Sequence, residues 1–326
     1  MSPTVSVVLP LFNCVEYVGE AIESILRQDY GDFELIVIDD GSTDETADIA
    51  RRYDDPRLRF YAQENRGLSA TLNRGIELAA GRYVARQDQD DLSKPARLGR
   101  QAAFLDDHPS CALVGTWAEV WVDRTPTERS HRHPSDNESL QYFLLLNNPF
   151  VHSSVMLRKE ALRDVGVYCT DRSRQPPEDY ELWSRIARKH EVANIPEALQ
   201  VYREVPGSMS RVGDSPFLNH LVTISAENIA WAAGLDASHP QVVNIAALVH
   251  SAPTRIVGRP EFTMMREIFL RATARVTGKR SEHFSKQAVA LVSSLRARYW
   301  ELLHGQSWRR HLFRIARGAR RLVLRS

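Results

Sequence analysis

The sequence predicts an α/β fold, in which a doubly wound and mainly parallel sheet is flanked by helices and followed by a helical C-terminal region. Up to residue 87, short β-branched and apolar runs alternate with segments of helical periodicity, which is the pattern of repeated βαβ units. Beyond residue 211, every clear periodic signal is helical. Two regions of different character are therefore expected.

The first region is expected to begin with four strands separated by three helices. The strands are continuous apolar runs, which are typical of strands buried on both faces, and Pro10 is expected to stop the first of them. Asp44 can cap the second helix, and Gly81 closes the third. The strands are expected at 5–9, 33–38, 58–62 and 83–87, and the helices at 15–28, 44–53 and 68–79.

The pattern changes after residue 110. A long strand is expected at 111–122, a polar loop with His and Pro at 124–139, a strand at 150–157 and a helix at 179–189. Helices follow at about 215–234, 241–249, 261–277 and 281–303, and the turn-like Gly213-Asp-Ser-Pro216 marks the domain boundary. We therefore expect a first domain at 1–212, with halves 1–110 and 111–212, and a second domain at 213–326.

Composition and charge are those of a soluble globular protein. The 326 residues are 43% hydrophobic and 25% charged, and the formal net charge of +1 argues against nucleic acid as a partner. No apolar run approaches the roughly 18–20 residues that a transmembrane helix needs, and the N-terminus lacks a secretory signal pattern. Cys14, Cys111 and Cys169 lie far apart, which suits a reducing compartment and favours neither a disulfide framework nor a zinc site. A cytoplasmic protein is expected.

The end of the chain is strongly basic. Residues 307–326 include seven arginines and no acid, so the rest of the chain carries about −6 (+1 minus +7). An apolar stripe that includes Trp308 and Leu312 runs between these arginines at helical spacing. Either the stripe packs on the preceding helices while the arginines pair with the acidic body, or the tail is an interfacial helix at the inner face of the cell membrane. The excess of cations favours peripheral membrane contact.

Two acidic clusters follow predicted strands. Asp39 and Asp40 follow the second strand, and Asp88-Gln-Asp-Asp91 follows the fourth. Ligands of parallel α/β sheets bind outside the carboxyl ends of the strands. Asp88 and Asp90 could both reach one hard cation, Mg²⁺ or Mn²⁺, and Asp40 could accept hydrogen bonds from a base or a ribose. Each cluster is also typical of an ordinary turn or helix cap, so neither identifies a site by itself.

A third acidic pair, Glu178 and Asp179, begins a predicted helix after two prolines. Acids in a first helical turn commonly interact with the helix dipole. His152 lies near the start of a predicted strand and is interpreted as a structural histidine. In isolation these residues do not predict a function.

An ordered set of motifs gives the wider pattern. It consists of Pro10-Leu-Phe-Asn13, Ser24-Ile-Leu-Arg-Gln28, Phe33-Glu-Leu-Ile-Val-Ile-Asp-Asp-Gly-Ser-Thr-Asp44, Asn65-Arg-Gly67, Asn73-Arg-Gly75, Gly81-Arg-Tyr83, Asp88-Gln-Asp-Asp91 and Pro95-Ala-Arg-Leu98. In this order and spacing, the set closely resembles glycosyltransferase family 2, the inverting enzymes with the GT-A fold. The resemblance runs from about residue 4 to residue 211, and the sequence beyond it resembles no family that we can identify.

The resemblance implies a nucleotide site at the ends of the first strands. Asp40 matches the family's nucleobase-binding aspartate. Pro10 and Asn13 would line the same pocket, and Arg66 lies where the family often places a basic residue near the nucleotide.

The resemblance also implies a metal site and a general base. Asp90 matches the direct metal ligand of the DxD pair, and Asp88 matches its partner, nearer the ribose. Asp179 matches the acid that supplies the general base. Arg203 could neutralise phosphate, but Glu204-Val-Pro206 replaces the histidine that follows this motif in many relatives, so a third protein ligand of the metal is left open.

The implied reaction moves a sugar from a nucleotide-diphosphate sugar, with a UDP-sugar as the expected donor, to a hydroxyl of a saccharide or lipid-linked saccharide. A divalent cation would offset the charge of the leaving diphosphate while Asp179 takes the acceptor proton on the opposite face, which inverts the anomeric centre. Membrane spans and a Gln-x-x-Arg-Trp motif are absent from the sequence, so a non-processive enzyme of surface polysaccharide or glycolipid synthesis is expected.

Two alternatives remain. One is a non-catalytic nucleotide-sugar-binding homologue, against which the intact DxD motif and Asp179 argue. The other is a sugar-1-phosphate nucleotidyltransferase, which would carry a Gly-rich loop where Pro10-Leu-Phe-Asn13 stands.

Overall fold

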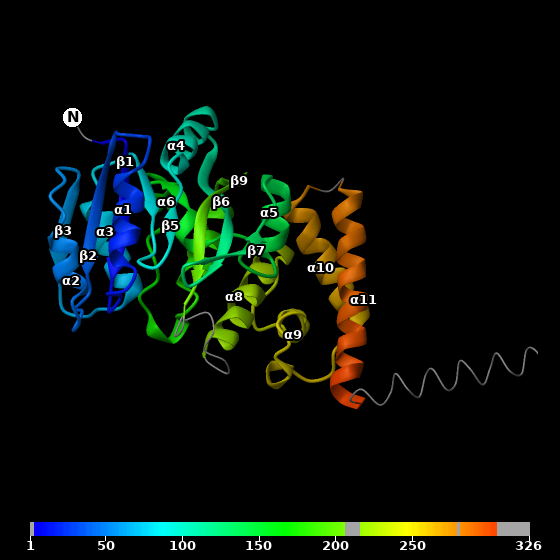
Figure 1. Cartoon of the computed structure of the whole chain (residues 1–326). Coiled ribbons are helices and arrows are strands. Elements are labelled where there is room, and N and C mark those ends of the chain that lie inside the picture. Colours follow the sequence, from blue (N-terminus) through cyan, green and yellow to red (C-terminus); the bar gives the residue numbers. More distant parts are fainter. Residues whose placement is uncertain (1–2, 206–215, 279–280, 305–326) are drawn as a thin grey trace, which may run out of the picture. The chain divides into compact units, whose positions relative to one another are not determined.

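The computed structural model describes residues 3–205, 216–278 and 281–304 of the chain (Figure 1). The chain forms two compact units, Met1–His220 and Leu221–Ser326. The predicted domain boundary at residues 212 and 213 lies outside the described residues, and so does the basic segment 307–326. The tail interpretation therefore stays a prediction.

The first unit is built on a mixed sheet, which has nine strands in the described part of the chain. Four of them pair in parallel in the order β3-β2-β1-β4, and the sheet continues through antiparallel β8 to β6, β9 and β5, with β7 beside β6. The strands are β1 (Val5–Leu11), β2 (Phe33–Asp39), β3 (Leu58–Ala62), β4 (Tyr83–Arg86), β5 (Leu92–Ser93), β6 (Cys111–Val122), β7 (Thr125–His131), β8 (Met156–Arg158) and β9 (Glu191–Glu204). This confirms the predicted α/β fold and the long strand at 111–122.

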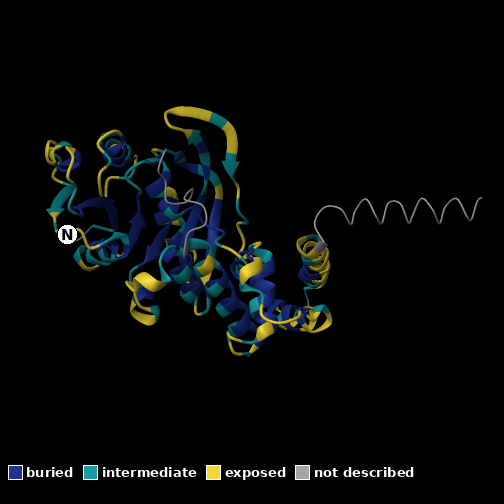
Figure 2. Ribbon diagram, turned by 90° about the horizontal axis from the view of Figure 1, so that it is seen from below, coloured by how far each residue is buried: buried dark blue, intermediate teal, exposed yellow. Residues whose placement is uncertain are grey.

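Strands β1 and β2 are buried on both faces because helices cover both sides of the sheet, whereas β3 at the edge is only partly buried. Every residue of β1 and β2 is buried, and Figure 2 shows this part of the sheet in the colour of buried residues. The helices around it bury apolar stripes against the sheet. They are α1 (Val18–Leu26), α2 (Thr46–Arg51), α3 (Leu68–Leu78), α4 (Arg97–Asp107), α5 (Asn137–Leu144), α6 (Ala161–Val165) and α7 (Glu178–Ala187).

Helix α3 lies unusually close to the sheet at Gly75. A Cβ atom at this position would lie 2.3 Å from Cγ1 of Val8, so any larger residue would push the helix away from β1. The close approach fixes α3 against β1, beside the nucleotide site predicted at the ends of these strands.

Strand β1 continues past its predicted end, through Pro10 to Leu11. The carbonyl of Val8 accepts a hydrogen bond from Gln87 on the β4 side, whereas the carbonyl of Leu11 accepts one from Asp40 on the β2 side. Because successive residues face alternate sides, Pro10 faces the β4 side, beyond the last pair of these two strands. Its missing N–H therefore costs no ladder hydrogen bond.

Two predictions for the middle of the chain were wrong. The expected loop at 124–139 contains β7, an exposed strand that pairs antiparallel with β6. The expected strand at 150–157 is interrupted by a 3₁₀ turn, His152–Ser154, and only Met156–Arg158 is extended. The Ser154 hydroxyl donates to the carbonyl of Val151 at 2.9 Å, and this local bond stabilises the turn in place of a ladder.

The C-terminal part of the chain is helical, as predicted. Its helices are α8 (Pro216–Ala233), α9 (Pro240–Val249), α10 (Phe262–Val276) and α11 (Glu282–His304). Within the described residues, no helix is both long and apolar enough to span a membrane.

Candidate active site

The carboxyl ends of the parallel strands bring three separate segments of the chain together. In the sheet, Leu11 of β1 lies opposite Asp39 of β2, and Val8 lies opposite Arg86 of β4. The segments that follow these strands therefore meet at one edge of the sheet. This edge holds the acidic turn 88–91 and the segments after β1 and β2.

The acidic turn after β4 contains three carboxylates in different surroundings. Asp88 forms an ion pair with Arg86, whose side chain is buried. Burial, followed by the negative charge of Asp88, raises the pKa of Asp90 to about 6, although Arg86 and Arg203 act in the opposite direction. Asp91 is fully buried, and its pKa is raised well above the ordinary value by burial and by the two neighbouring carboxylates.

Asp91 has a structural part in this turn. One of its oxygens accepts a hydrogen bond from the Ser153 hydroxyl, and the other accepts the backbone N–H of Arg203 at 2.8 Å. It therefore ties the turn to the 3₁₀ turn 152–154 and to β9. Asp88 and Asp90 remain as the carboxylates that can face a ligand.

Two glutamines hold the acidic turn from either side. Gln89 donates to the carbonyl of Phe12 at 3.1 Å and accepts the N–H of the same residue at 2.7 Å. Gln87 is buried and donates to the carbonyls of Asp88 at 3.0 Å and Asp91 at 2.8 Å. The acidic turn is thus bonded to the end of β1 and internally closed.

Asn13 connects the segments that follow β1 and β2. Its backbone has a positive φ of 46°, a conformation that Asn tolerates better than most residues. Its side-chain oxygen accepts the N–H of Thr43 at 2.8 Å, and its own N–H donates to the Ser42 hydroxyl at 3.0 Å. Pro10 lies three residues before it, in the buried end of β1.

Asp40 holds the segment between β3 and α3. One carboxylate oxygen accepts the Gln63 amide at 2.6 Å and the N–H of Arg66 at 2.9 Å, and the other accepts the N–H of Gly67 at 2.9 Å. Asp40 and Arg66, both predicted to contact the nucleotide, are therefore neighbours in space, although 26 residues separate them in the sequence.

The acidic pair Glu178 and Asp179 lies at the start of α7. Asp179 is partly exposed, and its carboxylate accepts the Asn148 amide and the N–H of Tyr180, both at 2.7 Å. Glu178 is buried, and burial together with the charge of Asp179 raises its pKa to about 7. Asp179 therefore provides an accessible carboxylate, whereas the carboxyl group of its neighbour Glu178 takes up a proton more readily than an ordinary glutamate does.

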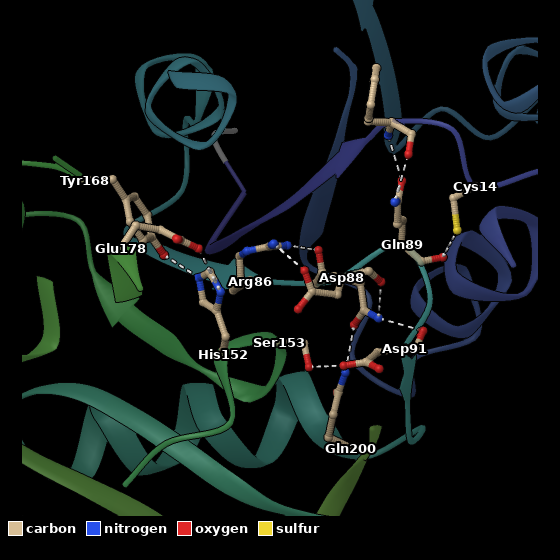
Figure 3. A network of polar contacts seen from close by, with 12 residues as sticks. Cys14, Arg86, Asp88, Gln89, Asp91, His152, Ser153, Tyr168, Glu178 and Gln200 are labelled. Carbon is tan, nitrogen blue, oxygen red and sulfur yellow. Dashed lines mark hydrogen bonds and ion pairs between the residues drawn. The ribbon is translucent and has the colours of Figure 1, made fainter. Parts of the chain in front are cut away.

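A cluster of buried polar side chains lies between the two acidic groups (Figure 3). In it, His152 lies 3.8 Å from Glu178 through Nδ1 and 3.1 Å from the Tyr168 hydroxyl through Nε2. Burial lowers the pKa of His152, and the charge of Arg86 acts in the same direction. The charge of Asp88 also contributes to raising the pKa of Glu178. The acidic turn and the start of α7 therefore meet at this cluster, where Arg86 forms an ion pair with Asp88 and His152 lies beside Glu178.

Arg203 lies near the end of β9. Its side chain is 1% exposed, forms an ion pair with Glu20 and lies over the Tyr17 ring, 5.3 Å from the ring centroid. Its Nε and Nη1 atoms are buried, and no described residue accepts a hydrogen bond from them. The charge of Arg203 also lowers the pKa of Asp90, so this cation lies beside the acidic turn.

The residues of the acidic turn fit a hard divalent cation. Asp88 and Asp90 supply the oxygen ligands that such a cation prefers, and burial together with the charge of Asp88 raises the pKa of Asp90. Among the described residues, no group of three or more His, Cys, Asp or Glu side chains could hold a metal ion. A bound cation would therefore take its other ligands from water and the diphosphate of a substrate.

The sequence did not identify Arg86, Gln87, Gln89 and Tyr168 as parts of this site. For Arg86 and Gln87 the sequence does contain a signal. They are polar residues at the end of an apolar strand, and because burying them without partners is costly, polar partners near the acidic turn could have been expected. No comparable signal marked Tyr168, whose partner His152 comes from a different segment.

The chain is similar to known glycosyltransferases. A model of "Glycosyl transferase family 2" matches residues 6–166. EpsE of Bacillus subtilis (strain 168), which has a provisional glycosyltransferase name, is 37% identical over 214 residues, 64% of this chain and 76% of EpsE. The amylovoran biosynthesis glycosyltransferase AmsE of Erwinia amylovora is 32% identical over 204 residues, 61% of this chain and 75% of AmsE.

Solved structures have the same fold at low sequence identity. S. aureus TarS 1–349 in complex with UDP-GlcNAc aligns with a TM-score of 0.62 at 20% identity, over 94% of this chain and 93% of TarS 1–349. The mannosyltransferase PcManGT from Pyrobaculum calidifontis, in complex with GDP-Man and Mn²⁺, aligns with a TM-score of 0.52 at 20% identity, over 99% of this chain and 81% of PcManGT.

Proposed function

This chain belongs to glycosyltransferase family 2 and is a glycosyltransferase, and from this premise we propose that it is an inverting, metal-dependent and non-processive enzyme. It moves a sugar from a nucleotide-diphosphate sugar to a hydroxyl of a saccharide or lipid-linked saccharide. The observation that carries the proposal is that one polar cluster joins the acidic turn to the start of α7, since Arg86 forms an ion pair with Asp88 and His152 lies 3.8 Å from Glu178 (Figure 3).

The donor nucleotide is proposed to bind at the ends of β1 to β3. Pro10, Asn13, Asp40 and Arg66 lie in segments joined there by the hydrogen bonds of Asn13 and Asp40. We take a UDP-sugar as the donor, and the complex of TarS with UDP-GlcNAc supports this choice. The complex of PcManGT with GDP-Man makes a GDP-sugar the main alternative.

The diphosphate is proposed to bind at the acidic turn with a divalent cation, Mn²⁺ or Mg²⁺. Such a cation, when bound, offsets the charge that develops on the leaving diphosphate. Asp88 and Asp90 would hold it, and Mn²⁺ in the PcManGT complex supports the assignment. Arg203, with two buried N–H groups that lack a partner among the described residues, would add positive charge near the phosphates.

Asp179 is proposed as the general base. Asp179 is more exposed than its neighbour Glu178. The Asn148 amide donates a hydrogen bond of 2.7 Å to its carboxylate and so orients it. A base on the face of the sugar opposite the diphosphate takes the proton of the attacking hydroxyl in a single displacement, and inversion follows. The buried Glu178, whose pKa is about 7, is less suited to this task because it faces His152.

The biological setting is proposed to be surface polysaccharide or glycolipid synthesis, in the cytoplasm. The name of AmsE, a relative that is 32% identical, refers to amylovoran biosynthesis. Peripheral membrane contact through the basic tail belongs to this proposal and is tested by sedimentation with anionic vesicles at low salt, in which the full chain should pellet and a chain ending at Gly305 should stay in solution.

A donor screen tests the proposed function. The full chain is titrated with UDP, GDP and dTDP in Mn²⁺ by calorimetry, and the matching UDP-sugars are then assayed for turnover. Metal-dependent binding of UDP together with turnover supports the proposal. Binding of UDP that is unchanged by EDTA would contradict the metal assignment, and the absence of nucleotide binding would contradict the function.

A further inference from the structure

A basic groove runs along the outer side of α3. Its cavity has a volume of about 610 Å³, and its walls come from α3, from α6 and from the segment around Val167 and Thr170. Four cationic side chains line it, together with one acid, Glu77. The four cations are Arg66, Arg74, Lys159 and Arg163.

These cations differ from most arginines of the first unit in having no carboxylate partner. Arg74 bonds to the Gln63 side chain at 2.8 Å, and Lys159 bonds to the carbonyl of Ala79, but both of these acceptors are neutral. Among the described residues, neither Arg66 nor Arg163 has an ion pair. Arginines elsewhere in the same unit do form ion pairs with acids, namely Arg27, Arg51, Arg57, Arg59, Arg82, Arg86, Arg100, Arg124, Arg129, Arg185 and Arg203.

The groove extends away from the predicted nucleotide site. Arg66 lies just before the start of α3, and Lys159 contacts Ala79, which follows its end. The helix has 11 residues and is therefore about 16 Å long at 1.5 Å per residue. Neither Asp88 nor Asp90, where the donor diphosphate is proposed to bind, lines the groove.

The groove is also linked to the cluster of buried polar side chains around His152. The side chain of Asn73, which lines the groove, donates to the carbonyl of Tyr168 at 2.8 Å and accepts its N–H at 3.0 Å. The Tyr168 hydroxyl, in turn, contacts His152 at 3.1 Å. Tyr168 therefore connects the groove, through Asn73, to the polar cluster at the start of α7.

We propose that this groove binds the acidic group, a phosphate or a carboxylate, of the acceptor saccharide. The proposal rests on the proposed glycosyltransferase function and adds to it the chemical class of the acceptor. Arginine forms strong, charge-assisted hydrogen bonds with both groups. The apolar side chains of Ile76 and Leu162 in the same walls suit the carbon face of a sugar ring.

The test uses the full chain with saturating Mn²⁺ and UDP, so that the donor site is filled. Glucose 6-phosphate, glucuronate and uncharged glucose are titrated separately by calorimetry. Both acidic sugars should bind saturably, and the tighter one identifies the acidic group. Arg163→Ala should weaken this binding about tenfold or more, as expected for a lost charge-assisted hydrogen bond, and Arg163→Lys should retain part of it.

The control is Arg52→Ala, which removes an exposed arginine outside the groove and should change nothing. Glucose binding as tightly as the acidic sugars, or an unchanged affinity in Arg163→Ala, would overturn the proposal. The UDP titration separates the two proposals. Wild-type protein that binds UDP but neither acidic sugar contradicts the groove alone, whereas the absence of binding to UDP, GDP and dTDP contradicts the proposed function.

Discussion

The side-chain amide of Gln89 forms two hydrogen bonds with the backbone of Phe12. Its N–H donates to the Phe12 carbonyl at 3.1 Å, and its oxygen accepts the Phe12 N–H at 2.7 Å. This side chain reproduces the pairing of a strand at a place where the strands have ended. Because Gln89 lies between Asp88 and Asp90, the position of both carboxylates depends on a contact 77 residues away in the sequence.

Gln89→Ala should weaken the metal site without unfolding the protein. Two hydrogen bonds, each contributing roughly 1 kcal/mol, would no longer hold the turn, so the Mn²⁺ concentration for half-maximal turnover should rise about tenfold. Steady-state kinetics over a range of Mn²⁺ concentrations measure this change. Gln287→Ala, which removes an amide from the surface of α11, is the control, and equal metal dependence in the two variants would contradict the positioning role.

Asp90→Ala should abolish turnover and weaken donor binding in Mn²⁺. The substitution removes one of the two proposed metal ligands, a carboxylate whose pKa burial and the charge of Asp88 raise to about 6. Calorimetry with UDP in Mn²⁺ and in EDTA measures the effect, since the variant in Mn²⁺ should behave like the wild type in EDTA. Asp54→Ala at an exposed position is the control, and full activity of Asp90→Ala would show that the metal is held elsewhere.

Asp179→Asn should lower kcat by roughly 10²- to 10⁴-fold, because it keeps the shape of the side chain but removes its basicity. The dissociation constant for UDP should barely change, because the residue lies outside the donor site. Rapid-quench turnover combined with calorimetry separates the two quantities, with Asp107→Asn as the surface control. A parallel collapse of UDP binding would assign Asp179 another role.

Glu178→Gln should change how stability depends on pH. Since the pKa of Glu178 is raised from 4.5 to about 7 in the folded protein, the folded state keeps a proton that the unfolded state releases between these values. The free energy of unfolding of the wild type therefore falls as pH rises through this range, and the loss is complete above about pH 7. The variant cannot ionise and lacks this loss.

Thermal unfolding in EDTA at about pH 5 and pH 8 measures this difference. The Tm of Glu178→Gln relative to the wild type should be higher at pH 8 than at pH 5. Glu160→Gln, at an exposed glutamate, should run parallel to the wild type. Parallel curves for Glu178→Gln as well would mean that this carboxyl ionises normally.

Elements with a buried, periodic pattern could be predicted from the sequence. The four C-terminal helices and β6 fall within one or two residues of their expected bounds, because apolar residues recur there at the spacing of the element. Strand β7 could not be found in this way. Its sequence, Thr-Pro-Thr-Glu-Arg-Ser-His, has no apolar face, and only pairing with β6 makes it a strand.

The positions of the site residues could be predicted, but their partners could not. The motifs place Asp40, Asp88, Asp90 and Asp179 at the ends of strands or at the start of a helix, and periodicity locates those ends. Asp91 bonds to Ser153, which is 62 residues away, and such a contact follows from tertiary packing that no local pattern encodes. The glutamines of the acidic turn were missed for the same reason.

The three hydrogen bonds accepted by Asp40 bear on which nucleotide the protein can recognise. A carboxylate has about four acceptor positions, and Gln63, Arg66 and Gly67 occupy three of them. Uracil and thymine present a single N–H on their pairing edge, which matches the one position that remains. Guanine presents two N–H donors there, so it would have to displace one of the three groups that already bond to Asp40, at the cost of that hydrogen bond. If Asp40 contacts the base as proposed, we expect the loop that closes on it to favour nucleotides of uracil or thymine over those of guanine.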